Sequence, residues 1–470
     1  MKIQFVILFS FISFRIVGQT TLSNDSINSK YQKENAIDTT ELGHTKEFAQ
    51  KINTFKNIDW DSHVRARHEF WNNQETLNDD IDDLYSFIRV KLHLGGGIRV
   101  SENIRIYTRI VSEGRFYGHK GSLDSTVNDY FQERERGKFE LLLAQFNFEW
   151  KNLLNNKLDI KIGRQNLHDQ GFGGQWLIGD GTPLDGSKTF YFNAARFTYS
   201  INKYSSLDLV GVINTAEDPL VIYSDNDITR TNITNEQGGW VWYKNKYFDQ
   251  YPIDFFYLFK HENGGGGYQR EEESNIHTVG FHLKPEVGLF WADAQFAAQT
   301  GTYGELDRRG LGSIIYAGLQ FKNHRSSFKV GPWYMYLSGD DPNTENFEAF
   351  NNLFGGYPND DELYINTWAK ESGTSMWTNI NLPGLFVEYM PTYKYNLRFW
   401  YHYMRANENM TGEFYGQGKE RGHMIMFKGM AEFTNNFKAY YMFEFLAAGN
   451  FYFQSADNAI LNRINLEWYF

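Results

Sequence analysis

The chain has 470 residues, a formal net charge of −11, 17% aromatic residues, nine prolines and no cysteine. This composition excludes a disordered chain, and the lack of cysteine excludes both a disulfide-stapled secreted domain and a lipoprotein. The length alone would allow two or three soluble domains. However, no Pro/Ser-rich linker follows residue 60, so we predict one large domain.

The N-terminal segment has the pattern of an export signal. Lys2 precedes an apolar run from Ile3 to Phe14, and the small residue Gly18 follows. The run is shorter than the roughly 18 residues that a spanning helix needs, so we expect cleavage near Gly18, with a short membrane anchor as the alternative. We therefore expect a signal peptide at residues 1–18, followed at 19–58 by a polar periplasmic lead-in or a short plug.

Residues 59–470 show the two-residue periodicity of β-strands. In "LYSFIRVKLHL" Arg89 and Lys91 alternate with aliphatic residues, and in "IRIYTRIV" Arg105 and Arg109 do the same. No window after the N-terminal segment holds 18 consecutive apolar residues, which excludes a helical membrane protein. A membrane β-barrel stays open, because its strands are recognised only by alternation.

The pattern contains eighteen candidate strands, and their connections are alternately short, as at Asn323–Ser326, and long, as at Ser338–Asn379. Short periplasmic turns and long extracellular loops are typical of outer-membrane barrels. The last strand, "NAILNRINLEWYF", alternates and ends on the aromatic Phe470, as barrel assembly signals do; the last strand of a soluble β-sandwich is the alternative. We predict an all-β fold, a transmembrane barrel of about 18 antiparallel strands in the bacterial outer membrane, with a water-filled lumen.

Three stretches resemble the alginate export family of outer-membrane porins. The first match is formed by "KIGRQNL", a Gly- and Trp-rich loop and "FNAARFTYS", and it resembles two strand ends of the family and the extracellular loop between them. The second, "YLSGDDPNTENFEAFNNLF", resembles another loop of the family. The third, "LYSFIRVKLHLGGGIRVSENIRIYTRIV", resembles the family's Arg-rich hairpin. The resemblance covers about residue 60 to Phe470. It implies passive passage of an anionic polyuronate or another anionic solute through an arginine-lined pore. Asn193, where the family usually has Asp, and the long loop from Ser338 leave the substrate open.

Cations that alternate with apolar residues are expected inside, because a charge at the lipid midplane costs about 2 to 4 kcal/mol. Arg164 shares the parity of Ile160 and Ile162, so it faces lipid unless a β-bulge near Gly163 intervenes; it is included because of the family motif. The candidate pore-lining, substrate-binding residues are Arg65, Arg67, Arg89, Lys91, Arg99, Arg105, Arg109, Arg164, Arg196, Arg398 and Arg463.

Other functions stay open at this point. The arginines could instead brace the wall by pairing with carboxylates such as Glu69, Glu149, Glu388 and Glu467. A general diffusion porin and a surface-binding barrel with a loop-blocked lumen are the alternatives to an anion channel. The available histidines have no catalytic spacing, so we expect no enzyme, and we expect no cofactor. The loop "SGDDPNTE" could hold calcium through its carboxylates, but we favour a solvated acidic loop and expect no metal.

The expected partners are an anionic oligo- or polysaccharide, outer-membrane lipid and lipopolysaccharide, and the barrel assembly machinery, with no nucleic acid. Tryptophans are expected at the membrane interface rather than as sugar platforms. These are Trp240, Trp242, Trp333, Trp400 and Trp468.

Overall fold

The structure is a computed structural model, which describes residues 58–74, 76–119, 121, 139–167, 176–179, 192–224, 234–248, 250–265, 271–355 and 378–470. The chain divides into two units, Met1–Asn53 and Thr54–Phe470, and all described residues belong to the second. The expected signal peptide and nearly all of the expected lead-in lie outside the described residues. Among those residues, no helix is long and apolar enough to cross a membrane.

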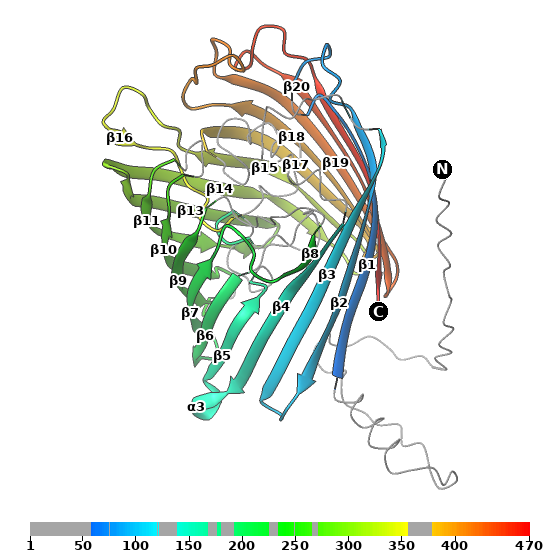
Figure 1. Ribbon diagram of the computed structural model, residues 1–470, viewed down its shortest axis with the longest axis vertical. Helices are drawn as coiled ribbons and strands as arrows, with labels where there is room; N and C mark the ends of the chain where they lie inside the picture. Colours follow the sequence, from blue (N-terminus) through cyan, green and yellow to red (C-terminus); the bar gives the residue numbers. More distant parts are fainter. Residues whose placement is uncertain are drawn as a thin grey trace. The chain divides into compact units, whose positions relative to one another are not determined.

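The second unit is a closed barrel of eighteen antiparallel strands (Figure 1), as the sequence predicts. Three short strands, β8 (Val221–Ser224), β12 (Glu286–Val287) and β16 (Asn346–Phe347), and the four-residue helix α3 (Leu153–Asn156) lie in connections. The barrel strands are β1 (Ile58–Asn72), β2 (Tyr85–Arg99), β3 (Ile104–His119), β4 (Phe139–Asn152), β5 (Leu158–Gln165), β6 (Phe192–Asn202), β7 (Ser205–Asn214), β9 (Glu236–Asn245), β10 (Ile253–Glu262), β11 (Ser274–Leu283), β13 (Phe290–Tyr303), β14 (Leu306–Lys322), β15 (Ser327–Leu337), β17 (Ile380–Thr392), β18 (Tyr395–Arg405), β19 (Glu420–Thr434), β20 (Phe437–Ala448) and β21 (Ala459–Tyr469).

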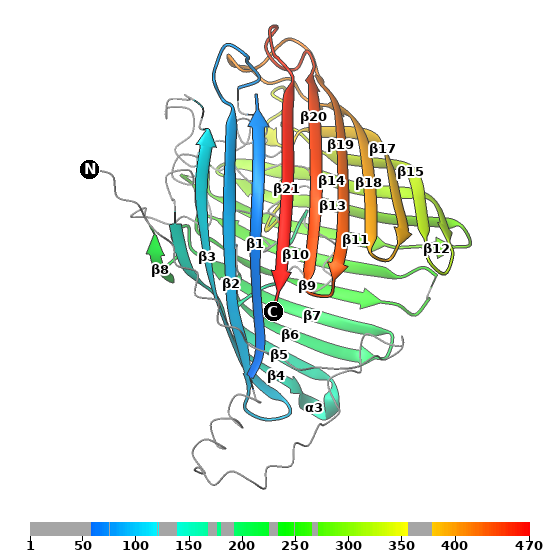
Figure 2. The same ribbon diagram turned by 90° about the vertical axis from the view of Figure 1, so that its right-hand side faces the viewer.

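The barrel closes between its first and last strands, which lie side by side in Figure 2. β1 pairs with β21 from His63↔Tyr469 to Asn72↔Ile460, and with β2 on its other edge. This closing pair leaves neither β1 nor β21 with an open edge, so the backbone N–H and C=O groups at the seam are satisfied inside the sheet, as lipid requires.

The two rims of the barrel carry different connections. On the rim where β21 ends, the connections are short, such as the one between β19 and β20. On the opposite rim they are long, such as the one between β15 and β17, which contains β16. One connection on the long-loop rim is an exception, because only Gly304 and Glu305 separate β13 from β14. Gly304 has φ +56°, a backbone conformation that a tight turn needs and glycine adopts without strain.

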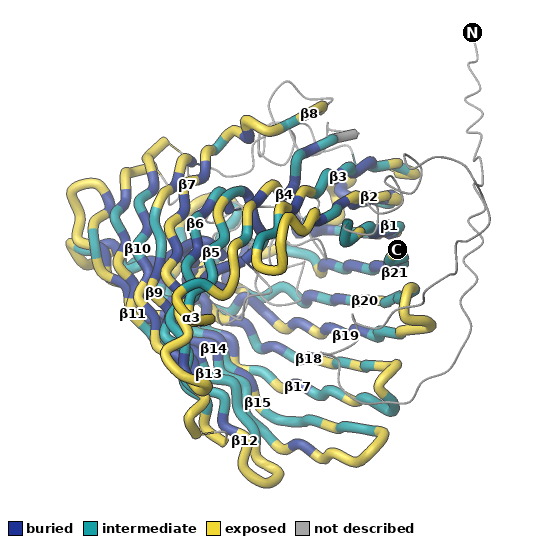
Figure 3. The backbone as a smooth tube through the Cα atoms, turned by 90° about the horizontal axis from the view of Figure 1, so that it is seen from below, coloured by how far each residue is buried: buried dark blue, intermediate teal, exposed yellow. Residues whose placement is uncertain are grey.

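The strands present two different faces, visible as the alternating colours along the chain in Figure 3. On β2, the aliphatic side chains of Ile88, Val90 and Leu92 are exposed, whereas Arg89 and Lys91 between them are buried. In a closed barrel the exposed apolar face is the outer one, which contacts the hydrocarbon of the membrane. The buried face therefore points inward.

The inner face is not polar everywhere. Trp240, Trp242, Trp333 and Trp400 are buried there, in one cluster with aliphatic side chains, so the prediction that these four form an interface girdle is wrong. Trp468 lies on the outer face, on the parity of the exposed Ile464. Trp240 faces inward against Phe354 of a long connection, and Trp242 and Trp333 pack against the rings of Phe256 and Tyr316 on neighbouring strands.

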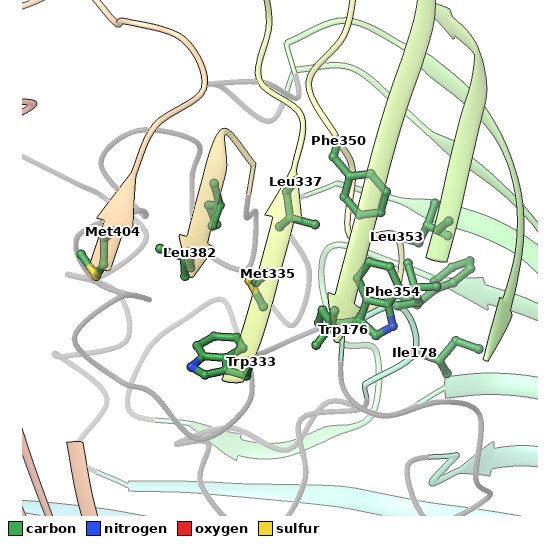
Figure 4. Packing of buried hydrophobic residues seen from close by; sticks show 14 of the residues in the cluster. Trp176, Ile178, Trp333, Met335, Leu337, Phe350, Leu353, Phe354, Leu382 and Met404 are labelled. Atoms are coloured by element: carbon green, nitrogen blue, oxygen red, sulfur yellow. The ribbon is translucent and has the colours of Figure 1, made fainter. Parts of the chain in front are cut away.

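Two segments of those connections pack on the inner face of the strands. Trp176–Gly179 meets Phe350–Gly355 through a parallel bridge between Ile178 and Phe354. Figure 4 shows Trp176, Ile178, Phe350 and Phe354 together beside the strand that carries Trp333. The rings of Trp176 and Phe350 stack with centroids 5.6 Å apart. Part of the interior is thus a packed apolar core.

Candidate functional site

The opposite part of the interior, on β1, β2, β3 and β21, is basic. Strand register places its charges in rows across the sheet. In one row Arg67 lies opposite Arg89, which lies opposite Arg115. In the next, Arg65 lies opposite Lys91, which lies opposite Glu113. Like charges directly opposite one another destabilise a sheet, so these rows need carboxylates nearby. We call these residues, with Glu69 and Arg463, the basic sector.

Glu69 is the central carboxylate of the basic sector. Its Oε1 lies 2.9 Å from Nη1 of Arg89, 3.3 Å from Nη1 of Arg67 and 3.3 Å from Nη2 of Arg463. Glu69 is fully buried and the three arginines are at most 3% exposed. Arg463 reaches it across the closing pair of strands, because it lies opposite Glu69 in the β1–β21 register.

Glu113 is the second carboxylate. Its Oε1 accepts a hydrogen bond from Nε of Arg89 at 3.0 Å, and its Oε2 one from Nη2 of Arg65 at 3.2 Å. Nε of Arg115 lies 3.9 Å away. Five guanidinium groups and Lys91 therefore surround the carboxylates of Glu69 and Glu113, and the buried Glu467 lies opposite Arg65 in the β1–β21 register. Arg67 also donates to Asn465 and Tyr440, which satisfy donors without adding negative charge.

Nearer the short-turn rim, the predicted cations of β2 and β3 are less buried and meet aspartates of β1. Arg99 donates from Nε to Asp59 at 3.0 Å, and Arg105 Nε lies 3.6 Å from the same carboxylate. Arg109 pairs with Asp61. The side chain of Arg105 is 32% exposed and that of Arg109 15%. Among the predicted cations of β1, β2, β3 and β21, these are the ones that water reaches.

Arg196 and Arg398 lie on other sectors of the wall and are not part of the basic sector. Arg196 pairs with Asp208 at 2.6 Å, and Lys244 shares that carboxylate at 3.1 Å. Arg398 lies 2.8 Å from Glu388, with its side chain 30% exposed. Each therefore has one nearby carboxylate of the kind expected for a braced wall.

Arg164 differs from the other ten. Its cross-strand neighbours are Phe146, which is exposed on the outer face, and Asn193. The side chain is nevertheless buried, because both terminal nitrogens donate to Asp218, at 2.7 and 3.0 Å, and Asp218 belongs to the connection between β7 and β9. Gly163, with φ +118°, twists the strand just before it. By strand register, the side chain of Arg164 thus belongs to the outer face of the barrel. Its ion pair with Asp218 neutralises its positive charge there.

The structure sorts the eleven predicted cations into three groups. It brings together Arg65, Arg67, Arg89, Lys91 and Arg463. It places Arg99, Arg105 and Arg109 beside them toward the short-turn rim, and it separates Arg164, Arg196 and Arg398 from them.

Sequence reasoning missed Arg115 and Glu113. Both share the parity of Arg105 and Arg109 along β3, so extending the same alternation would have included them. It also missed Lys260, a buried cation of β10 that pairs with Glu236 and Glu262, each at 2.7 Å.

Comparison with known proteins agrees with this architecture. The sequence model of the family described as "Alginate export" matches residues 57–421. No curated protein sequence matches the chain.

Among solved structures, OccAB4 of Acinetobacter baumannii is similar with a TM-score of 0.55 at 10% sequence identity, covering 88% of this chain and 98% of that one. A BenF-like porin from Pseudomonas fluorescens Pf-5 has a TM-score of 0.53 at 9% identity, with the same coverage. OccK2 (OpdF) of Pseudomonas aeruginosa, solved in complex with glucuronate, has a TM-score of 0.53 at 8% identity and again covers 88% and 98%.

At these identities the solved structures establish the fold alone, and that fold is the outer-membrane porin barrel. The family match covers more than half of the chain and includes the strands of the basic sector except β21. This chain therefore belongs to the alginate export family, and it is an outer-membrane β-barrel channel.

Proposed function

We propose that this barrel conducts anionic solutes passively across the outer membrane, with oligo- or polysaccharides of the uronate type, such as alginate, or other small anions as substrates. The observation that carries the proposal is the concentration of cations in the basic sector, where five guanidinium groups and Lys91 lie around Glu69 and Glu113 in a chain of net charge −11. Charge distribution, not net charge, sets the local potential that a permeating ion meets.

The predicted cations have two roles in this proposal. Arg105, Arg109 and Arg398 keep exposed surface, so they form the lining that an anion touches. The buried set, Arg65, Arg67, Arg89, Lys91 and Arg463, raises the potential behind that lining. Guanidinium groups suit this task because they bind carboxylates through two parallel charge-assisted hydrogen bonds and remain ionised. The proposal makes no use of Arg164, because its register is that of the outer face.

A uronate chain carries one carboxylate per sugar, so several weak sites along a basic wall let it advance from one site to the next. Conduction requires sites that are weak enough for the solute to leave. Each exposed cation of this lining also pairs with an aspartate or a glutamate of the wall, and this pairing lowers its affinity for a passing carboxylate. Two structural neighbours, OccK2 with glucuronate and OpdK of Pseudomonas aeruginosa with vanillate, were solved with small carboxylate-bearing molecules, which makes these molecules suitable first probes.

Two other functions have support from specific observations. Ion pairing of Arg196 and Arg398 favours a general diffusion porin whose arginines brace the wall. The packed segment Phe350–Gly355 favours a surface-binding barrel with a blocked lumen. We propose no enzymatic activity, because the family and fold are those of channels.

The test is single-channel recording of the wild-type barrel and of the double variant Arg105→Gln, Arg109→Gln in planar bilayers. We expect wild-type reversal potentials in a KCl gradient to show anion preference, and the variant to shift toward cations and to lose block by glucuronate and oligouronates. The shift should shrink in 1 M salt, where the screening length falls to about 3 Å. Arg325→Gln, on an exposed short turn, is the matched control and should behave as wild type.

A wild-type channel that prefers cations at low salt would overturn the proposal. Unchanged selectivity in the double variant would assign Arg105 and Arg109 to bracing.

A further inference from the structure

The three consecutive glycines of β2, Gly95–Gly97, lie just inside the short-turn rim. Parity places Gly95 and Gly97 on the inner face, in line with Lys91, and both are buried. A glycine inside a strand weakens the strand, and it often marks a place where another group approaches the backbone closely. The row of inward side chains on β2 therefore has a gap two positions long beside the basic sector.

Two side chains of β3 lie in this gap. Strand register sets Tyr107 opposite Gly97 and Arg105 opposite Arg99, but each side chain leans away from the short-turn rim, to the next inward position of β2. A Cβ atom at position 95 would lie 2.8 Å from the hydroxyl oxygen of Tyr107, and one at position 97 would lie 2.6 Å from Cζ of Arg105. Carbon atoms in contact prefer about 3.5 to 4.0 Å. Glycine at 95 thus makes room for the Tyr107 hydroxyl, and glycine at 97 for the Arg105 guanidinium.

The guanidinium of Arg105 is held mainly by packing. Its Cζ lies 4.8 Å from the centroid of the Tyr107 ring, which is a cation–π contact. Its Nε lies 3.6 Å from the carboxylate of Asp59, whose two oxygens already accept hydrogen bonds from Arg99, at 3.0 and 3.1 Å. Among the described residues, Nε of Arg105 has no hydrogen-bond partner. Arg105 is therefore a weakly paired cation, and 32% of its side chain is exposed.

The acid on the other side of Arg105 is Glu149, which lies opposite it on β4. Glu149 pairs with Lys151 at 3.4 Å. The gap at Gly97 places the Arg105 guanidinium on the side of β2, with Asp59 and Tyr107. The position of the guanidinium is thus set by the absence of a side chain at residue 97.

We propose that Gly97 is a specificity-determining position of the channel: it sets how far the Arg105 guanidinium extends into the lumen, and so how strongly the channel holds a carboxylate of the solute. This inference rests on the proposed passage of anionic solutes and assigns Arg105 as a contact of that solute. With glycine at 97 the guanidinium lies against the wall near Asp59, and binding stays weak enough for the solute to leave, as conduction requires.

A side chain at position 97 would change this balance in a defined direction. Its Cβ atom would project from the inner face toward the lumen, so the guanidinium that it displaces moves the same way. The displacement also takes Arg105 away from Asp59, whose carboxylate stays bound to Arg99. A guanidinium with less pairing forms stronger charge-assisted hydrogen bonds with a passing carboxylate. Tighter binding and slower passage follow.

The experiment is planar bilayer recording of the full barrel at low salt, with glucuronate as the blocking anion. We expect Gly97→Ala to lower the half-blocking concentration at least threefold, and Arg105→Ala to raise it at least threefold. The double variant Gly97→Ala, Arg105→Ala should match Arg105→Ala, because the guanidinium that the new Cβ displaces is then missing. Gly211→Ala is the matched control and should behave as wild type, since its Cβ would meet no atom within 4 Å.

Unchanged or weaker block in Gly97→Ala overturns the inference, and so does an equal effect of Gly97→Ala with and without Arg105. If Gly97→Ala lowers the amount of folded barrel, Arg105→Ala must restore it, because the three atoms nearest to the new Cβ all belong to Arg105. Failure to restore it also overturns the inference. A wild-type channel that prefers cations overturns the proposed function, whereas anion preference with no effect of Gly97→Ala overturns the role of Gly97 alone.

Discussion

Glu69 is the residue on which the charge balance of the basic sector depends most. It lies within hydrogen-bonding or ion-pairing distance of Arg67, Arg89 and Arg463, and none of these groups has appreciable solvent exposure. A buried ion pair adds little net stability, but removing one partner leaves uncompensated charge in a poorly solvated place. The carboxylate is therefore expected to matter for folding more than for selectivity.

Glu69→Gln should lower the free energy of unfolding by about 3 to 5 kcal/mol, because the amide neither neutralises nor fully accepts from three guanidinium groups. Tryptophan fluorescence during urea unfolding in lipid vesicles measures this loss. The matched control is Asp307→Asn, which removes one carboxylate from the exposed pair with Arg309 and should change stability by less than about 1 kcal/mol. A similar small change in both variants would show that water reaches Glu69.

The inward segment Ala349–Gly355 is the element that most alters the shape of the interior. Its backbone is held by side chains of three strands: Arg308 Nη1 donates to the carbonyl of Ala349 at 3.0 Å, Gln299 Nε2 to that of Asn351 at 2.6 Å, and Lys260 to that of Leu353. The Phe354 ring packs against Trp240 at 5.6 Å between centroids. Polar anchors for backbone groups and apolar packing for side chains together fix a connection inside the barrel.

Removing the side chains of Phe350, Leu353 and Phe354 by substitution with alanine should raise single-channel conductance at least twofold, because the inward segment then loses its packing and leaves volume to water. Planar bilayer recording in 1 M KCl measures the change. Tyr247→Ala with Phe248→Ala, which removes two exposed aromatic rings from a short turn, is the control and should leave conductance unchanged. A conductance that stays at the wild-type value in the triple variant would show that the permeation path runs elsewhere.

The molecule as a whole is defined by closure between β1 and β21. Beyond the last residue of β21, the backbone N–H of Phe470 donates to the carbonyl of Ser62 at 2.9 Å, so the end of the chain completes the seam. The Phe470 ring itself is 73% exposed. A side chain with so few contacts in the folded barrel contributes little to its stability, which is consistent with a role during assembly.

Phe470→Ala should reduce the amount of folded barrel in the outer membrane severalfold, while the purified folded variant unfolds at the wild-type denaturant concentration. Heat-modifiability on gels of outer-membrane fractions measures the first quantity. Tyr393→Ala, an equally exposed aromatic residue on a short turn, is the control. Equal abundance of the two variants would argue against recognition of the terminal aromatic ring by the assembly machinery.

The eighteen strands and the two faces of β1 to β3 were predictable because alternation is a local property that a water–lipid boundary imposes on every strand. The tryptophans were not. Around Trp240 and Trp242 both faces of β9 are apolar, since the outer one meets lipid and the inner one meets Phe354 and Phe192. Alternation of polarity vanishes there, and only contacts between distant segments decide which face is inside.

The sequence pattern named Glu69 and Glu388 as acids that could pair with the arginines, and both do, but it could not say which arginine each one meets. Glu69 and Glu113 lie 44 positions apart and meet the same Arg89 because β1 and β3 flank β2 in register. Parity alone put Arg164 on the outer face, and its register agrees. The charge of Arg164 can lie on the outer face because it pairs with Asp218, 54 residues away in the sequence. That ion pair depends on how the connection after β7 folds back, which the sequence pattern does not show.

The two-residue connection at Gly304–Glu305 makes the barrel usable as a display scaffold. It joins β13 and β14 on the cell-surface rim, and the pairing of Tyr303 with Leu306 fixes the spacing of its ends. A peptide inserted between Gly304 and Glu305 would start and finish on adjacent paired strands, away from the basic sector. The flanking strand ends also hold the connection that leads to the inward segment, through Tyr303 on Phe347 and Arg308 on Ala349, so the insert must leave these two contacts in place. Epitopes placed there should be accessible to antibodies on intact cells without disturbing the interior.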